Sequence, residues 1–146
     1  MDMNDNNNEN KIIINGRTVY EGKAEGYALV SKDGIGTFGS LDERTGIITE
    51  RNHAIFGKCI ADTILVFPYG KGSSAWGKAF HNLYYKKLTP KAMLINQIDS
   101  KTALGAVTSR VPVVTDFDKD PLELIDTGDW VEVDADQGMI VVTKKS

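Results

Sequence analysis

The sequence predicts an α/β fold: one compact domain in which a strand-rich layer packs on a mixed sheet that carries helices, with flanking hairpins. The middle of the chain alternates strand-like and helix-like segments, which favours parallel strands joined by right-handed crossovers. Both ends instead show short β-branched runs separated by turn residues, which favours antiparallel pairing. At 146 residues the chain corresponds to about one domain, which we place at residues 11–146.

The first ten residues differ in composition from the rest of the chain. Residues 1–10 are polar and rich in asparagine, without a basic segment or an apolar stretch. They offer nothing apolar to bury, so we predict a disordered tail rather than a signal peptide.

The first half of the predicted domain consists of strands. Ile12–Ile14 and Thr18–Tyr20 flank the turn pair Asn15-Gly16, which predicts a hairpin. The continuous apolar run Ile64–Phe67 is typical of a strand buried on both faces. Further short strands are expected at residues 24–30, 35–38 and 47–49.

The second half begins with a change of period. Apolar residues recur at helical spacing from Trp76 to Tyr84, so we predict a helix that starts at Ser73 or Ser74 and ends before Thr89-Pro90. The segments that should follow are a strand at 92–95, a helix capped by Asp99 or Ser100, a strand at 112–114, a brief helix opened by Pro121 and a closing hairpin of 130–133 with 139–143.

Composition excludes several classes of function. The net charge of −3 is unlike a basic nucleic-acid footprint, and no apolar run approaches membrane-spanning length. The single cysteine, Cys59, excludes an internal disulfide and a self-contained iron–sulfur site, and we expect it in the core. These features predict a cytoplasmic protein with no nucleic-acid or membrane partner and no metal bound by this chain.

The junction Phe67–Ser74 is the strongest candidate site. A buried strand ends, a glycine-rich loop follows and a helix begins, an arrangement that suits an anionic ligand at the helix N-terminus. Ser73 then has two possible roles, proton acceptor or plain helix cap. The loop is not a phosphate-binding P-loop, because Lys71 stands between the glycines.

Other reactive side chains form no recognisable set. His53 and His81 have no partners at metal-ligand spacing, so both are interpreted as surface or packing residues. No nucleophile-elbow motif supports a hydrolase. The carboxylates in polar segments are interpreted as turn residues and solubilising charge: Asp42, Glu43, Asp116, Asp118 and Asp120.

The segment Gly70–Ser74 resembles the Gly-x-Gly-Ser-Ser segment in the swivelling domain of aconitases and isopropylmalate isomerases. The wider pattern is closer to the small subunit of the aconitase X family. That likeness is carried by Gly22–Val30, by Phe38-Gly39 with Asp42, Thr45, Gly46 and Ile48, by Leu65–Ser73, and by Gly105-Ala106 and Val111–Val114. It spans about residues 12 to 134.

The resemblance implies a swivelling β/β/α domain that docks on a large subunit carrying an iron or iron–sulfur centre. Ser73 would be the proton acceptor of a dehydratase, with Lys71, Gly72 and Ser74 near the substrate. The substrate would be a small anionic hydroxy acid, either phosphomevalonate or cis-3-hydroxy-L-proline. The chain departs from its relatives at Gly39-Ser40, where they often have two glycines. At Ala75 aconitases proper have an arginine, so substrate choice stays open.

Two other interpretations remain: a non-catalytic module, or a phosphohistidine-type swivelling domain. The segment Gly128–Asp134 resembles the tail of phosphohistidine domains. That function needs a histidine in a loop at a helix start, whereas His81 lies inside the predicted helix and His53 lacks this context.

Overall fold

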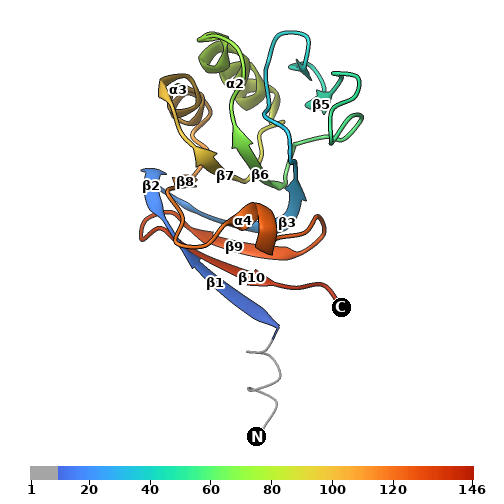
Figure 1. Ribbon diagram of the computed structural model, residues 1–146. Coiled ribbons are helices and arrows are strands. Elements are labelled where there is room, and N and C mark those ends of the chain that lie inside the picture. Colours follow the sequence, from blue (N-terminus) through green and yellow to red (C-terminus); the bar gives the residue numbers. More distant parts are fainter. Residues whose placement is uncertain (1–9) are drawn as a thin grey trace, which may run out of the picture.

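The computed structural model describes residues 10–146 as three layers, two of β-sheet and one of helices (Figure 1). The elements in chain order are β1 (Lys11–Asn15), β2 (Arg17–Tyr20), β3 (Lys23–Val30), β4 (Leu41–Asp42), β5 (Ile47–Ile48), β6 (Ile64–Tyr69), α2 (Ala75–Lys86), β7 (Ala92–Gln97), α3 (Ser100–Ser109), β8 (Val113–Thr115), α4 (Pro121–Leu124), β9 (Trp130–Asp134) and β10 (Met139–Thr143). The predicted mixed α/β class is confirmed.

Strand β3 joins the two β layers. Its first part, Lys23–Tyr27, pairs antiparallel with β9, and its last part, Ala28–Val30, pairs parallel with β6. The full order is β1-β10-β9-β3-β6-β7-β8-β2. As predicted, β6, β7 and β8 are parallel and β9 and β10 form an antiparallel hairpin.

The predicted hairpin of Ile12–Ile14 with Thr18–Tyr20 is wrong. Strand β1 pairs with β10, whereas β2 pairs with β8 at the opposite end of the strand order. The chain passes from one β layer to the other at Gly16, whose N–H donates to the Gly138 carbonyl at 2.7 Å. A Cβ at Gly16 would lie 2.6 Å from the Thr115 carbonyl oxygen, so glycine serves here as a close crossing point rather than a turn.

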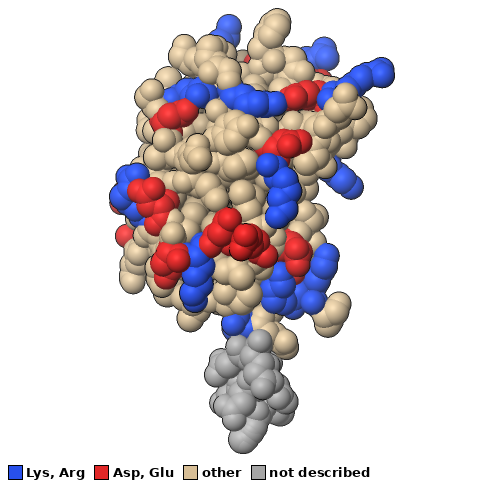
Figure 2. Space-filling model, viewed as in Figure 1, with Lys and Arg blue, Asp and Glu red and all other residues tan. Residues whose placement is uncertain are grey.

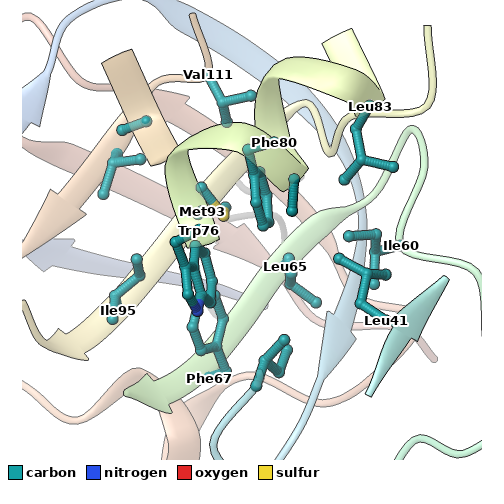
Figure 3. Packing of buried hydrophobic residues seen from close by; sticks show 14 of the residues in the cluster. Leu41, Ile60, Leu65, Phe67, Trp76, Phe80, Leu83, Met93, Ile95 and Val111 are labelled. Carbon is teal, nitrogen blue, oxygen red and sulfur yellow. The ribbon is translucent and has the colours of Figure 1, made fainter. Parts of the chain in front are cut away.

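Two apolar clusters hold the layers together. One lies between the β layers and includes Ile14, Val66, Leu94, Val131 and Ile140. The other lies between the sheet and the helices and includes Leu65, Phe67, Trp76, Phe80, Leu83 and Met93 (Figure 3). Strand β6 contributes to both clusters, which confirms that it is buried on its two faces.

The helices begin close to where the sequence predicts. Helix α2 starts after Ser74 and ends at Lys86, with Lys87 in the left-handed region at φ 61°. Helix α3 starts after Asp99, which forms a reciprocal capping box with Thr102. Helix α4 has Pro121 in its first turn.

Two local expectations differ from the structure, and a third falls largely outside the described residues. The expected strand at 35–38 is reduced to a single bridge between Ile35 and Gly70, and Phe38 is 99% exposed. The expectation that Cys59 is a core residue is wrong, because the side chain is exposed and contacts the Thr45 carbonyl. The predicted tail lies outside the described residues except for Asn10, whose carbonyl accepts the Lys144 N–H.

No helix within residues 10–146 combines the length and the apolar character needed to cross a bilayer.

Candidate active site around Ser73

The loop Gly70–Ser74 connects the carboxyl end of β6 to α2 (Figure 1). Three hydrogen bonds hold the backbone at the start of this loop. The Ile35 N–H donates to the Tyr69 carbonyl at 3.0 Å, and the Lys71 N–H donates back to the Ile35 carbonyl at 2.8 Å. The indole N–H of Trp76 donates to the Lys71 carbonyl at 3.2 Å. The loop therefore has a fixed course before any ligand binds.

Trp76 ties this loop to the helical layer. Its ring is fully buried and stacks between Phe67 and Phe80, with ring centroids 6.0 and 4.5 Å away (Figure 3). This packing places the first turn of α2 directly over the end of β6. Trp76 is thus a structural residue of the loop.

The two glycines of the loop are needed for different reasons. A Cβ at Gly70 would overlap the methyl group of Thr102 and lie 3.2 Å from the Trp76 ring. Gly72 has open space around it but adopts φ +89°, which side-chain-bearing residues rarely adopt. Gly70 allows close packing, and Gly72 gives the loop its sharp change of direction.

Ser73 is exposed and stands between two hollows of the surface. The first is lined by Gly36, Thr37, Phe38, Gly39, Ser40, Glu50, Lys71, Gly72 and Ser73. The second is lined by Gly72, Ser73, Ser74, Asp99, Ser100, Lys101 and Leu104. The structure therefore brings the predicted residues Ser73 and Gly72 to both hollows, and places Lys71 on the first and Ser74 on the second.

The Ser73 hydroxyl makes one local contact. Its Oγ accepts the Ala75 N–H at 3.3 Å, while Ser74, the residue at the N-cap position, makes no side-chain capping bond. The bond is long and leaves the hydroxyl open to the hollows. The bond to the Ala75 N–H and contact with a ligand are therefore compatible at Ser73.

Lys71 is paired with Glu50, a residue that the sequence analysis missed. The Lys71 Nζ lies 3.1 and 2.9 Å from the two carboxylate oxygens, and the Ser40 hydroxyl donates to Oε1 at 2.7 Å. The Ser40 hydrogen bond and then Lys71 hold the pKa of Glu50 below its usual value. Glu50 lies 21 residues before Lys71, and no motif or periodicity in the sequence connects the two.

This arrangement suits an anion that carries an acidic C–H. The N-terminus of α2 bears partial positive charge, and Lys71 adds an ammonium at the first hollow. A carboxylate or phosphate is stabilised there. Ser73 lines the same hollow as Lys71, so a hydroxyl and a group that attracts anions lie on one surface depression.

The histidines lie outside this arrangement. The Ile55 N–H donates to His53 Nδ1 at 3.2 Å, so Nε2 carries the proton and donates to the Gly34 carbonyl at 2.8 Å. Because both nitrogens are bonded, His53 connects two loops and is not free to take a phosphoryl group. His81 lies within α2 against Tyr85, with ring centroids 4.9 Å apart.

The carboxylates singled out in the sequence all have structural partners, which for Glu43 is the Asn82 side-chain amide and for Asp116 is Arg17. Asp42 accepts the Arg44 N–H, Asp118 accepts the Asn15 N–H, and Asp120 caps α4. Within residues 10–146, no group of three His, Cys, Asp or Glu side chains is arranged to hold a metal ion. Figure 2 shows acidic and basic side chains interspersed over the viewed face rather than gathered into a basic patch.

Comparison with known proteins shows the family. The model of the aconitase X swivel domain matches residues 13–142. The chain is 40% identical to a phosphomevalonate dehydratase small subunit from Methanococcoides burtonii, over 88% of this chain and 94% of that protein. A protein of the same name from Methanosarcina mazei is 39% identical, over 92% and 93% of the two chains.

A solved structure points to the same family. The crystal structure of aconitase X from Thermococcus kodakaraensis in its holo-form superposes with a TM-score of 0.85 at 35% identity, covering 91% of this chain and 99% of that chain. Both the sequence and the course of the backbone match over nearly the whole domain. The chain therefore belongs to the aconitase X family and has the fold of its swivel domain.

Proposed function

We propose that this chain is the small subunit of a two-subunit hydro-lyase, in which Ser73 takes a proton from the substrate. The observation that carries the proposal is the position of Ser73: exposed, at the start of α2, and on a hollow that also contains Lys71. Relatives at 39–40% identity are named phosphomevalonate dehydratase small subunit, which supports the same reaction class.

Phosphomevalonate is the substrate that we propose first. The two relatives carry its name, and its carboxylate and phosphate both need cationic or N–H partners. Lys71 and the N-terminus of α2 supply one such set, and the partner subunit would supply the other. Neither of these two relatives is named for the second candidate, cis-3-hydroxy-L-proline, which serves as the alternative outcome of the assay.

The proposed step balances within the substrate. Ser73 Oγ reacts as the alkoxide: it accepts a proton from one carbon and becomes the hydroxyl, the electron pair of that C–H bond forms the new C=C bond, and hydroxide leaves from the adjacent carbon. A serine hydroxyl is a weak base, so its alkoxide needs stabilisation. The Ala75 N–H, which donates to Ser73 Oγ, and the partial positive charge at the start of α2 would provide it, and Lys71 lines the same hollow.

Among residues 10–146, the side chains do not fit a metal centre. Cys59 is the sole cysteine of the sequence and is exposed, whereas an iron–sulfur cluster needs several thiolates. We therefore propose that the iron or iron–sulfur centre implied by the family lies on the large subunit. The complex is proposed to act in the cytoplasm, without nucleic-acid or membrane partners.

The large subunit is proposed to dock over the Ser73 face. Phe38, on the rim of the first hollow, is 99% exposed, which is unusual for a phenylalanine in a folded domain. A partner that covers this rim would bury Phe38 and exclude water from Ser73 in the same step.

Co-expression with the large subunit followed by assay of both substrates tests the proposal. We expect the purified complex to dehydrate phosphomevalonate. Turnover of cis-3-hydroxy-L-proline alone would reassign the substrate and keep the reaction class. A stable complex that dehydrates neither compound would overturn the proposed function.

A further inference from the structure

We infer that Glu50 is a positioning residue of the Ser73 site, which acts by holding the Lys71 ammonium in place for an anionic group of the ligand. The inference rests on the proposed function and deepens it. It starts from the contacts of one carboxylate with two side chains that line the same hollow, Ser40 and Lys71.

Glu50 connects three segments that are far apart in the sequence. Its Oε1 accepts the Ser40 hydroxyl at 2.7 Å, and both oxygens lie within 3.1 Å of Lys71 Nζ. The backbone repeats the connection, because the Thr49 N–H donates to the Ser40 carbonyl at 2.8 Å. The carboxylate is therefore fixed from both sides and gives the ammonium a defined location.

Stability alone does not explain this arrangement. The side chains of Lys71 and Glu50 are 37% and 33% exposed, and half-exposed ion pairs contribute little to folding. What the pair does fix is geometry. A lysine ammonium has three N–H donors, and within the described residues Lys71 Nζ contacts the two oxygens of Glu50. One donor is left for a ligand in the hollow.

Glu50 has two opposite effects on the binding of an anion in the hollow, one through its charge and one through its contact with Lys71. Its negative charge weakens the attraction of the hollow for an anion. Its two oxygens restrict the flexible four-carbon side chain of Lys71. A ligand that binds the ammonium therefore loses less free energy to ordering that side chain. Glu50→Ala and Glu50→Gln remove the same charge, but glutamine keeps an acceptor for Lys71 and for Ser40. A difference between the two variants therefore reports positioning rather than charge.

The experiment is a double-mutant cycle in the complex with the large subunit. We expect kcat/KM for phosphomevalonate to be at least about fivefold higher in Glu50→Gln than in Glu50→Ala, mainly through KM. In a Lys71→Ala background the two Glu50 variants should agree within about twofold, because the group that they position is gone. Thermal midpoints of the two should lie within about 5 °C of each other.

Asp116→Asn is the matched control, because it removes a carboxylate from an exposed ion pair with Arg17 outside the hollow. It should leave kcat/KM unchanged. Equal kcat/KM for Glu50→Gln and Glu50→Ala would overturn the inference. So would a difference between them that persists without Lys71.

A second readout does not need the partner. The full chain is titrated with inorganic phosphate, and the backbone amides of Gly72 and Ser73 are followed by NMR. Glu50→Gln should bind phosphate more tightly than Glu50→Ala, and equal affinities would count against Glu50. Should this difference appear while the wild-type complex fails to dehydrate either substrate, the proposed function is wrong and the positioning role stands.

Discussion

The inner and outer faces of the Gly70–Ser74 loop differ sharply. On the inner face, Gly70 is buried with no room for a Cβ between Thr102 and the Trp76 ring. On the outer face, Gly72 and Ser73 are exposed and line open hollows. The core holds one face rigidly, so the other can remain free for a ligand. Substitutions on the two faces should therefore separate stability from activity.

The largest effect is expected on the outer face. Ser73→Ala removes the proposed proton acceptor, and we expect turnover of the complex to fall by about 10³-fold or more, which corresponds to about 4 kcal/mol of transition-state stabilisation. The free energy of unfolding should change by less than about 1 kcal/mol, because the hydroxyl is exposed and its bond to the Ala75 N–H is long at 3.3 Å. Steady-state kinetics and chemical denaturation measure the two quantities.

Ser74→Ala is the matched comparison, since the neighbouring hydroxyl makes no capping bond. It should lose much less activity than Ser73→Ala. Near-normal dehydration by the Ser73→Ala complex would show that the proton acceptor lies elsewhere.

The next effect belongs to the inner face. Gly70→Ala inserts a methyl group where Thr102 and Trp76 leave no space, so we expect a loss of about 3 kcal/mol in the free energy of unfolding. Denaturant titration of the isolated chain measures it. Gly57→Ala is the control, with φ +81° and no heavy atom near its Cβ position, and it should cost only about 1 kcal/mol. Equal losses of unfolding free energy in the two variants would mean that packing against Thr102 and Trp76 is not what requires glycine at position 70.

The sequence predicted the inner face of this loop better than its outer face. The apolar run of β6 and the spacing from Trp76 onward are local patterns, so both the buried strand and the following helix could be placed. Glu50 could not be found, because its contact with Lys71 depends on how a loop after β5 folds against the end of β6.

The errors have a common origin in long-range packing. Asn15-Gly16 has the composition of a hairpin turn, yet β1 finds a better partner in β10 and β2 in β8. Cys59 begins an apolar stretch, but its side chain faces solvent. Local composition limits the conformations that a segment can adopt, whereas contacts with the rest of the chain determine which conformation and which strand partner it has.

The ion pair of Asp129 with Lys144 lies far along the chain from the loop, so it should affect stability without affecting activity. Asp129 is fully buried, and Lys144 Nζ lies 2.6 Å from its carboxylate. Burial acts to raise the pKa of Asp129, but the hydrogen bonds from Lys144 and from two backbone N–H groups outweigh it, so the pKa lies below its ordinary value near 3.8. This contribution to stability is present above pH 3.8 and is lost as the pH falls through the lower, folded-state pKa.

Asp129→Asn should therefore destabilise the chain by about 2 kcal/mol at pH 7, and the difference from wild type should shrink below pH 4. Denaturation curves between pH 3 and pH 7 measure this. Asp126→Asn is the control on the same lysine, because that carboxylate is 70% exposed and should cost less than about 1 kcal/mol. Dehydratase activity of the complex should survive both changes. If the loss of unfolding free energy in Asp129→Asn does not depend on pH, the ion pair is not its cause.

The smallest expected effect lies on the rim of the outer face and concerns association alone. Phe38→Ala should weaken binding of the large subunit by about tenfold, or about 1.4 kcal/mol, because an exposed phenyl ring gains most of its stabilisation when a partner covers it. In the free chain the ring is 99% exposed, so its removal should leave the unfolding free energy unchanged. Phe56→Ala, at 54% exposure in a different loop, is the control for a general loss of apolar surface. If calorimetry finds equal affinities for wild type and Phe38→Ala but a raised KM, the ring contacts substrate rather than the partner, and the outer face is then a binding surface more than a docking surface.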